Sequence, residues 1–153
     1  MNYWLIKSEA DCYSIDNLKK DKKTAWTGVR NYQARNFMQK MAVGDGILFY
    51  HSNGTKEHPT GVYGTANVVK LAHPDETQFE KGGEYFEPRA TLEKPVWYCV
   101  DVGFVERFKN PVSLTEIKLD PKLTGIMVAQ TGSRLSVQPV SEKHFVHITK
   151  LGK

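Results

Sequence analysis

Apolar residues come in short runs along this chain, and most of the runs have the character of β-strands. Apolar, β-prone segments occur at Tyr3–Ile6, Ile47–Tyr50 and Trp97–Val105, and a further strand is expected at Val62–Val69. Another segment, Arg134–Gln138, alternates apolar and polar residues, which is the period of a half-buried strand. The pattern predicts a protein built mainly on short strands.

The helical period is clearest after Asn31. Ala34, Phe37, Met38 and Met41 follow the i, i+3, i+4, i+7 spacing of one helix face. The Gly-Asp-Gly sequence that follows should end this helix and turn the chain into the next strand.

Three shorter helical segments complete the pattern. Ser14 and Ser113 each fit the N-cap position of a short helix, because a serine hydroxyl can accept from the free N–H groups of a first turn. A final amphipathic turn carries Phe145, Ile148 and Leu151.

Strands with short helices between them, and no regular βαβ rhythm, predict an α+β fold. We expect a small mixed β-barrel with short flanking helices rather than a doubly wound sheet. Residues 73–95 are rich in proline, glycine and charge and should form an excursion from the barrel. No repeat or linker divides residues 1–153, which predicts a single domain. Its predicted core contains Leu5, Ile47, Phe49, Val68, Val100, Leu135 and Val137.

Composition narrows the class of protein only moderately. The 153 residues are 40% hydrophobic and 25% charged, as in ordinary globular proteins. A net charge of +4 and a pI of about 9.0 permit phosphate binding without requiring it. No stretch approaches the roughly 20 apolar residues that span a bilayer, and the N-terminus lacks the layout of a signal peptide. We therefore expect a cytoplasmic protein, or a nuclear one in a eukaryote, with no membrane partner.

The cysteines and histidines do not predict a metal site. Cys12 and Cys99 stand far apart and outside any metal-binding spacing. His144 and His147 are three residues apart, but no further ligands follow at a spacing that would complete a zinc site. The chain also has no phosphate-binding loop and no Ser/His/Asp set. We expect neither a metal nor another cofactor, and no enzymatic activity.

Polar and aromatic residues gather at the ends of the predicted strands. The four clusters are Lys7-Ser8-Glu9, Trp26 with Gly28–Asn31, Phe49–Asn53 and Ser133–Ser136. Strand ends and loops on a rigid scaffold are where binding sites concentrate.

Several of these residues have two interpretations. Trp26 is either a core residue or a platform on which a base stacks. Arg30 and Asn31 stand at a helix N-terminus, where they either hold a phosphate or, for Arg30, pair with a surface carboxylate. His51 either reads a base edge or is a satisfied structural histidine. The polar residues around Ser136 either line a pocket or meet water.

Five segments resemble the EVE domain family: WLIKSE, WTGVRNYQARNFM, GDGILFYHSN, VDVGFV and GSRLSVQPV. The resemblance runs from Trp4 to Leu151 and implies one EVE domain of the PUA-like superfamily. It also implies recognition of modified bases, chiefly 5-methylcytosine and its oxidised forms in DNA. In the related YTH readers a similar Lys-Ser and a downstream Trp help to form an aromatic cage, which implies such a role for Lys7, Ser8 and Trp26. The chain departs from many members at Ala10, where they carry proline, and this affects the rigidity of the loop.

The residues and the resemblance together predict a non-catalytic reader of a modified base. The expected base pocket consists of Lys7, Ser8, Glu9, Trp26, Tyr50, His51, Ser52 and Ser136. The expected phosphate contacts are Arg30, Asn31, Arg35 and Arg134.

Two alternatives stay open. One is a reader of modified RNA. The other is a small hydrolase of modified nucleosides, since Lys7 and Glu9 share one strand face and some ASCH-domain relatives use a Lys, Thr and Glu set for such a reaction. A salt bridge between Lys7 and Glu9 is the simpler interpretation of that pair.

Overall fold

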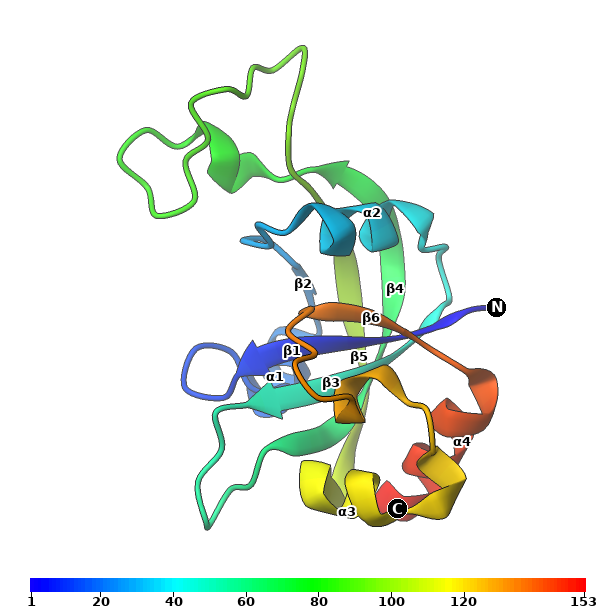
Figure 1. The fold of residues 1–153 in the computed structure, drawn as a ribbon. Coiled ribbons are helices and arrows are strands. Elements are labelled where there is room, and N and C mark those ends of the chain that lie inside the picture. The colour runs from blue at the N-terminus through cyan, green and yellow to red at the C-terminus, as the bar shows by residue number, and fades with distance from the viewer.

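A six-stranded sheet organises the computed structural model of the chain, which describes all 153 residues (Figure 1). The strands are β1 (Tyr3–Glu9), β2 (Lys23–Ala25), β3 (Gly46–Ser52), β4 (Gly61–Pro74), β5 (Tyr98–Ser113) and β6 (Val137–Val140). The α-helices are α1 (Ile15–Asp21), α2 (Tyr32–Lys40), α3 (Leu114–Leu119) and α4 (Glu142–Gly152). Three short 3-10 helices are η1 (Glu76–Phe79), η2 (Pro121–Leu123) and η3 (Met127–Ala129). The predicted α+β class is confirmed.

The strand order in the sheet is β2-β5-β4-β3-β1-β6. Neighbouring strands are antiparallel except β1 and β3, which run parallel. The edge strands β2 and β6 are not paired with each other, so the sheet is open and the predicted barrel is a loose one. Three residues in β2 and four in β6 leave too little backbone for the staggered ladder that closes a barrel.

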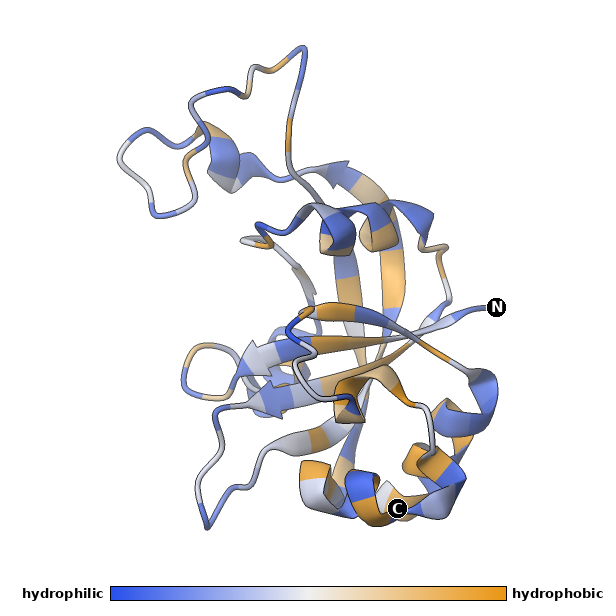
Figure 2. Ribbon diagram, viewed as in Figure 1, coloured by the Kyte–Doolittle hydropathy of each residue, from blue (hydrophilic) through white to orange (hydrophobic).

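Both faces of the central strands are buried. β1 directs Trp4 and Ile6 toward one apolar cluster and Leu5 toward the other, as the alternation of side chains along a strand requires. Met38 of α2 packs in the first cluster and Ile148 of α4 in the second. Figure 2 shows hydrophobic residues along the strands in the middle of the molecule. This two-sided burial explains why β1 and β3 read as continuous apolar runs.

Most of the predicted core is confirmed. Six of the seven expected residues are exposed by 1% or less: Leu5, Ile47, Phe49, Val68, Val100 and Val137. Leu135 is only partly buried. The reason is that β6 begins at Val137, so most of the predicted strand at Arg134–Gln138 is a loop.

The predicted helix starts are also confirmed. The Ser14 side chain accepts from the Asn17 N–H in a capping box, and the Ser113 side chain accepts from the Glu116 N–H. Asn31 caps α2. The final amphipathic turn is a full helix, α4, on which Leu151 is 40% exposed rather than buried.

The longest strands extend well beyond their predicted ends. β4 continues to Pro74, and β5 runs from Tyr98 to Ser113. Polar residues after Val69 and Val105 interrupt the apolar run, yet the backbones continue to pair as far as Pro74 opposite Tyr98. The excursion of residues 75–97 therefore starts where this ladder ends, and Figure 1 shows it at the opposite end of the molecule from α3 and α4. No helix is long and apolar enough to cross a membrane.

Candidate nucleic-acid interface

A pocket opens where the end of β1 meets the segment that follows β2. Its volume is about 620 Å³, within the usual range of ligand sites. Three aromatic side chains line it, those of Tyr13, Trp26 and Tyr85. The other lining residues are Lys7, Ser8, Glu9, Cys12, Thr24, Ala25, Thr27, Gly28, Val29, Arg30, Glu84 and Ser136.

The buried run of β1 ends at Ile6, and the next three residues, Lys7, Ser8 and Glu9, line the pocket. Lys7 is half-buried; its Nζ donates to the Ser133 carbonyl oxygen at 3.4 Å and lies 5.6 Å from the centroid of the Tyr50 ring. Burial lowers the pKa of Lys7 from its ordinary value. An ammonium carries three N–H groups, so this side chain keeps donors available for a ligand.

Ser8 and Glu9 form the wall beside Lys7. The Ser8 hydroxyl donates to the Tyr13 carbonyl oxygen at 2.7 Å, which ties β1 to the loop before α1. The Glu9 carboxylate accepts from the Asn53 amide at 2.6 Å and forms no ion pair with Lys7. The two residues line one pocket, but the salt bridge considered for them is not formed.

Ser136 completes this wall from the loop before β6. Its carbonyl oxygen accepts from the Lys7 backbone N–H at 2.9 Å, so the loop is held against β1. Gln138, which alternation places on the same side as Ser136, is buried, and its Nε2 donates to the Leu135 carbonyl oxygen at 2.8 Å. Of the polar residues in this segment, Ser136 lines the pocket and Gln138 belongs to the interior.

Trp26 belongs to the core and to the pocket at the same time. Its side chain is 9% exposed, and its ring meets Tyr13 and Phe49 edge-on, with centroids 6.0 Å and 5.5 Å away. The indole Nε1 forms no hydrogen bond with the rest of the chain, and no fully buried side-chain nitrogen lacks a partner. The indole N–H therefore keeps some exposure, and since Trp26 lines the pocket, we take this donor to face it.

Tyr50, His51 and Ser52, which were expected in the base pocket, are not among the residues that line this pocket. His51 is 6% exposed; its Nε2 accepts from the Ile15 N–H at 3.0 Å, and its ring stacks on Tyr63. Burial lowers the pKa of His51 to about 4, which keeps the ring neutral and able to accept. His51 is thus the structural histidine of the two interpretations, and it accepts the first backbone N–H of α1.

Tyr50 and Ser52 lie on either side of this histidine. Tyr50 is 3% exposed and packs in the second apolar cluster, and burial raises its pKa to about 12. The Ser52 hydroxyl donates to the Ser8 carbonyl oxygen at 3.4 Å. Tyr50 therefore belongs to the core, and Ser52 is hydrogen-bonded to a strand residue that lines the pocket.

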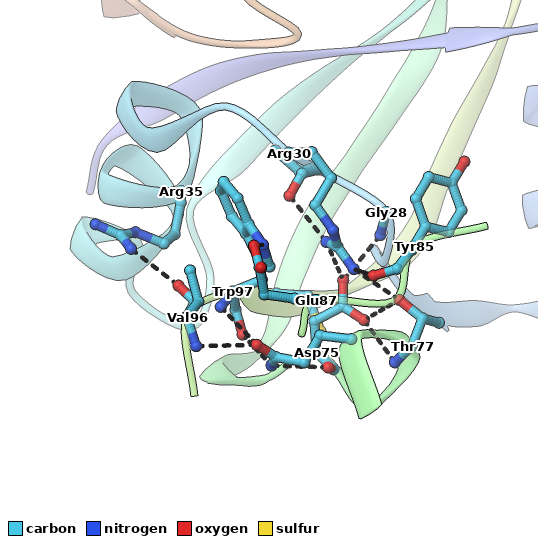
Figure 3. A network of polar contacts seen from close by, with 12 residues as sticks. Gly28, Arg30, Arg35, Asp75, Thr77, Tyr85, Glu87, Val96 and Trp97 are labelled. Carbon is cyan, nitrogen blue, oxygen red and sulfur yellow. Dashed lines mark hydrogen bonds and ion pairs between the residues drawn. The ribbon is translucent and has the colours of Figure 1, made fainter. Parts of the chain in front are cut away.

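Arg30 lies at the centre of a polar network that fastens residues 75–97 to the segment before α2 (Figure 3). Its Nη1 donates to Asp75 Oδ2 at 3.0 Å. Its Nη2 donates to Thr77 Oγ1 at 3.0 Å and to the Tyr85 carbonyl oxygen at 2.9 Å. The interpretation of Arg30 as paired with a carboxylate is therefore the one observed, and both terminal nitrogens are engaged.

Asp75 is the buried partner in this network. Its side chain is 1% exposed, and it also accepts from the Gly28 N–H at 2.8 Å. Burial raises the pKa of Asp75, but the hydrogen bonds from Thr77, Gly28 and Arg30 outweigh this and hold the pKa below its ordinary value. The carboxylate is thus charged and fully occupied.

The other predicted phosphate contacts lie in three different settings. Arg35 donates to the Val96 carbonyl oxygen at 2.9 Å and packs over the rings of Tyr32 and Trp97, so it too fastens the excursion (Figure 3). The Asn31 side chain accepts from the Ala34 N–H as the cap of α2. Arg134 is exposed on the loop before β6, and its guanidinium forms no hydrogen bond or ion pair within the chain.

Tyr13 and Tyr85 are pocket residues that the sequence pattern did not reveal. The Tyr13 hydroxyl donates to Asp21 at 2.8 Å, and burial together with this bond raises its pKa to about 12. Tyr85 is 38% exposed and comes from the excursion, which has no periodicity to indicate where its side chains point. The only local signal for Tyr85 was an aromatic residue in an otherwise polar, glycine-rich stretch.

One cluster at the rim brings three candidate metal ligands together. Ligand atoms of Glu9, Asp11 and Cys12 lie within 4.8 Å of one another, and all three residues are exposed. Three exposed ligands are fewer than the four of a structural zinc site, and Glu9 already accepts from Asn53. These three residues alone do not complete a structural zinc site.

Comparison with known proteins places this chain in a family. The sequence profile of the EVE domain matches residues 2–151. Human thymocyte nuclear protein 1 is 40% identical over 168 residues, a match that covers 98% of this chain and 73% of the human protein.

Solved structures agree over the whole chain. A protein from Pseudomonas syringae superimposes with a TM-score of 0.92 at 43% identity, covering 99% of both chains. Human THYN1 protein in complex with 5-methylcytosine-containing DNA superimposes with a TM-score of 0.89 at 37% identity, covering 100% of this chain and 98% of that one. The chain belongs to the EVE domain family.

Proposed function

We propose that this protein is a non-catalytic reader that holds a modified base of DNA, 5-methylcytosine or an oxidised derivative, in the pocket at the end of β1. One observation carries the proposal: Trp26 is nine-tenths buried and lines a pocket of about 620 Å³, yet its indole N–H has no hydrogen-bond partner in the chain. An unpaired donor in an aromatic pocket suits a flat ligand with acceptors on its edge. The human relative bound to 5-methylcytosine-containing DNA supports the same ligand class.

The pocket offers the hydrogen-bonding groups that a cytosine edge requires. Cytosine presents two acceptors, O2 and N3, and one donor, the exocyclic amine. Lys7 and the Trp26 indole provide donors, and the Glu9 carboxylate provides an acceptor. Ser8 and Ser136 complete the polar wall. Base-on-aromatic stacking adds about 1–3 kcal/mol of affinity whichever base enters.

A base in duplex DNA must leave the helix to enter this pocket. Extrusion costs about a few kcal/mol, so a weakened or unpaired base enters more readily. We assign flanking phosphates to Arg134, whose guanidinium is exposed and free. Arg30 and Arg35 are left out of the phosphate set because their guanidinium groups are engaged within the chain. Asn31 stays in the set, because its side-chain oxygen caps α2 while its amide N–H groups form no hydrogen bond in the chain. Human thymocyte nuclear protein 1 is a nuclear protein by name, and we propose that this chain likewise acts in the compartment that holds DNA.

Titration with matched oligonucleotides tests the proposal. We expect duplex DNA with one 5-methylcytosine or 5-hydroxymethylcytosine to bind more tightly than the same duplex with cytosine. The same sequence as RNA, with and without 5-methylcytidine, separates a DNA reader from an RNA reader through the 2′-hydroxyl. Equal affinity for modified and unmodified strands of both kinds would overturn the proposal.

The hydrolase alternative rests on Lys7. Burial lowers the pKa of its amine, as catalysis by lysine requires, and Glu9 lines the same pocket. Glu9, however, is bonded to Asn53 and not to Lys7. Incubation with N4-acetylcytidine and other modified nucleosides, followed by chromatography, should show no product. Turnover that Lys7→Met abolishes would establish the hydrolase instead.

A further inference from the structure

The pocket has one wall that the sheet does not provide. Tyr85, on the excursion, is 38% exposed and lines the pocket together with Trp26. Its ring lies against the backbone of Gly28, where a Cβ atom would stand 2.9 Å from the ring. Gly28 also has a φ of +86°, a conformation that side chains disfavour. Glycine at this position thus allows the tyrosine ring to approach.

The position of Tyr85 depends on Arg30. The Arg30 guanidinium donates to the Tyr85 carbonyl oxygen at 2.9 Å and lies 5.2 Å from the centroid of the Tyr85 ring. The same guanidinium is paired with Asp75, whose side chain is 1% exposed. Because residues around Tyr85 have no regular secondary structure, these contacts are what hold the ring at the pocket.

The second aromatic wall is close to the first. Trp26 precedes Gly28 by two residues, so their Cα atoms are at most about 7 Å apart. Both Trp26 and Tyr85 also line the same pocket of about 620 Å³. A single base in that pocket can therefore contact both rings.

We propose that Tyr85 contacts the bound base directly, opposite Trp26, and that Arg30 is a positioning residue that holds Tyr85 there. The inference rests on the proposed function of the pocket and adds to it a wall from a segment remote in sequence. It also changes the role of Arg30: the arginine serves base recognition through Tyr85 and does not touch the nucleic acid.

Variants of two adjacent aromatic residues test the contact. Tyr85→Ala should weaken binding of 5-methylcytosine DNA by about tenfold or more, as loss of a stacking ring does. Tyr85→Phe keeps the ring and should bind nearly as the wild type does. Phe86→Ala is the matched control, because Phe86 is 36% exposed on the same segment and does not line the pocket. Equal binding by Tyr85→Ala and the wild type, or an equal loss in Phe86→Ala, would contradict the contact.

A double-mutant cycle tests the role of Arg30. Arg30→Lys keeps the charge but loses the forked contacts, so it should weaken binding and speed amide exchange in residues 75–97. In a Tyr85→Ala background the same change should cost no further affinity, because the ring that Arg30 positions is already absent. Additive losses would instead show that Arg30 acts on the nucleic acid independently of Tyr85, and would overturn the positioning role.

The wild type separates this inference from the function on which it rests. If the unaltered protein shows no preference for a modified base, the proposed function fails and Tyr85 has no base to contact. If the wild type keeps the preference and Tyr85→Ala keeps it undiminished, only the inference about Tyr85 fails.

Discussion

The wall that β1 gives to the pocket and the wall formed by residues 75–97 differ in what holds them in place. Lys7, Ser8 and Glu9 continue a strand that is paired on both sides and anchored by apolar residues on both faces. Tyr85 stands on a segment without strands, held by a charged network around Arg30 and Asp75. The first wall depends on hydrophobic burial and the second on hydrogen bonds between residues about 45 positions apart in the chain. The pocket therefore combines a rigid side with a side that polar substitutions can loosen separately.

The largest expected effect belongs to the rigid side. Phe49 is fully buried and meets the edge of Trp26, so Phe49→Ala leaves a cavity beneath the pocket. We expect a loss of about 3–5 kcal/mol in the free energy of unfolding, measured by urea denaturation. A loss below about 1 kcal/mol would mean that the sheet side is not held by its core.

Acid should loosen the support behind the same wall. The folded pKa of His51 is about 4, below its ordinary value of 6.5. The unfolded chain therefore takes up a proton as the pH falls below about 6.5, whereas the folded chain does so only near 4. As the pH falls through this window, the free energy of unfolding should decrease by about 1.4 kcal/mol for each unit of difference between the two pKa values. Above the window, the contribution of His51 should not change with pH. Unfolding of His51→Gln, which lacks this proton, should show a shallower slope; an unchanged slope would contradict the assignment.

The excursion should respond locally. Asp75→Asn removes the charge that pairs with Arg30. We expect this to lower the free energy of unfolding by about 1–3 kcal/mol. Hydrogen exchange should quicken in residues 75–97 while β1 and β3 stay protected. Glu80→Gln, an exposed change on the same segment, is the control. Equal loosening of sheet and excursion would show that the two walls are not separate.

The smallest effect concerns the free arginine. Arg134→Ala should weaken the binding of modified and unmodified DNA alike. It should also reduce the slope of log affinity against log salt concentration by about one. Lys118→Ala on α3 is a control of equal charge. Loss of base preference alone would make Arg134 a base-reading residue.

The same contrast explains what the sequence predicts. Continuous apolar runs locate β1 and β3, and helical spacing locates α2. These patterns place Lys7, Ser8 and Glu9 at the end of a strand and Trp26 in the segment before α2. Hydrogen-bond partners far apart in the chain leave no period, so the pairing of Arg30 with Asp75 and the place of Tyr85 could not be predicted.

His51 shows a second limit of sequence analysis. A histidine at a strand end has the same pattern whether it faces a ligand or caps a helix. Only the position of α1, which brings the Ile15 N–H to Nε2, decides between the two.

The most direct test of the base pocket is a paired titration of Trp26→Phe and the wild type with one duplex, carrying either cytosine or 5-methylcytosine. Phenylalanine keeps an apolar ring but lacks the indole N–H and the larger surface. We expect the wild type to prefer the methylated duplex. Trp26→Phe should lose most of this preference while its affinity for the unmodified duplex stays nearly the same. An undiminished preference in a folded Trp26→Phe protein would contradict the proposed base pocket, because the base would then bind elsewhere.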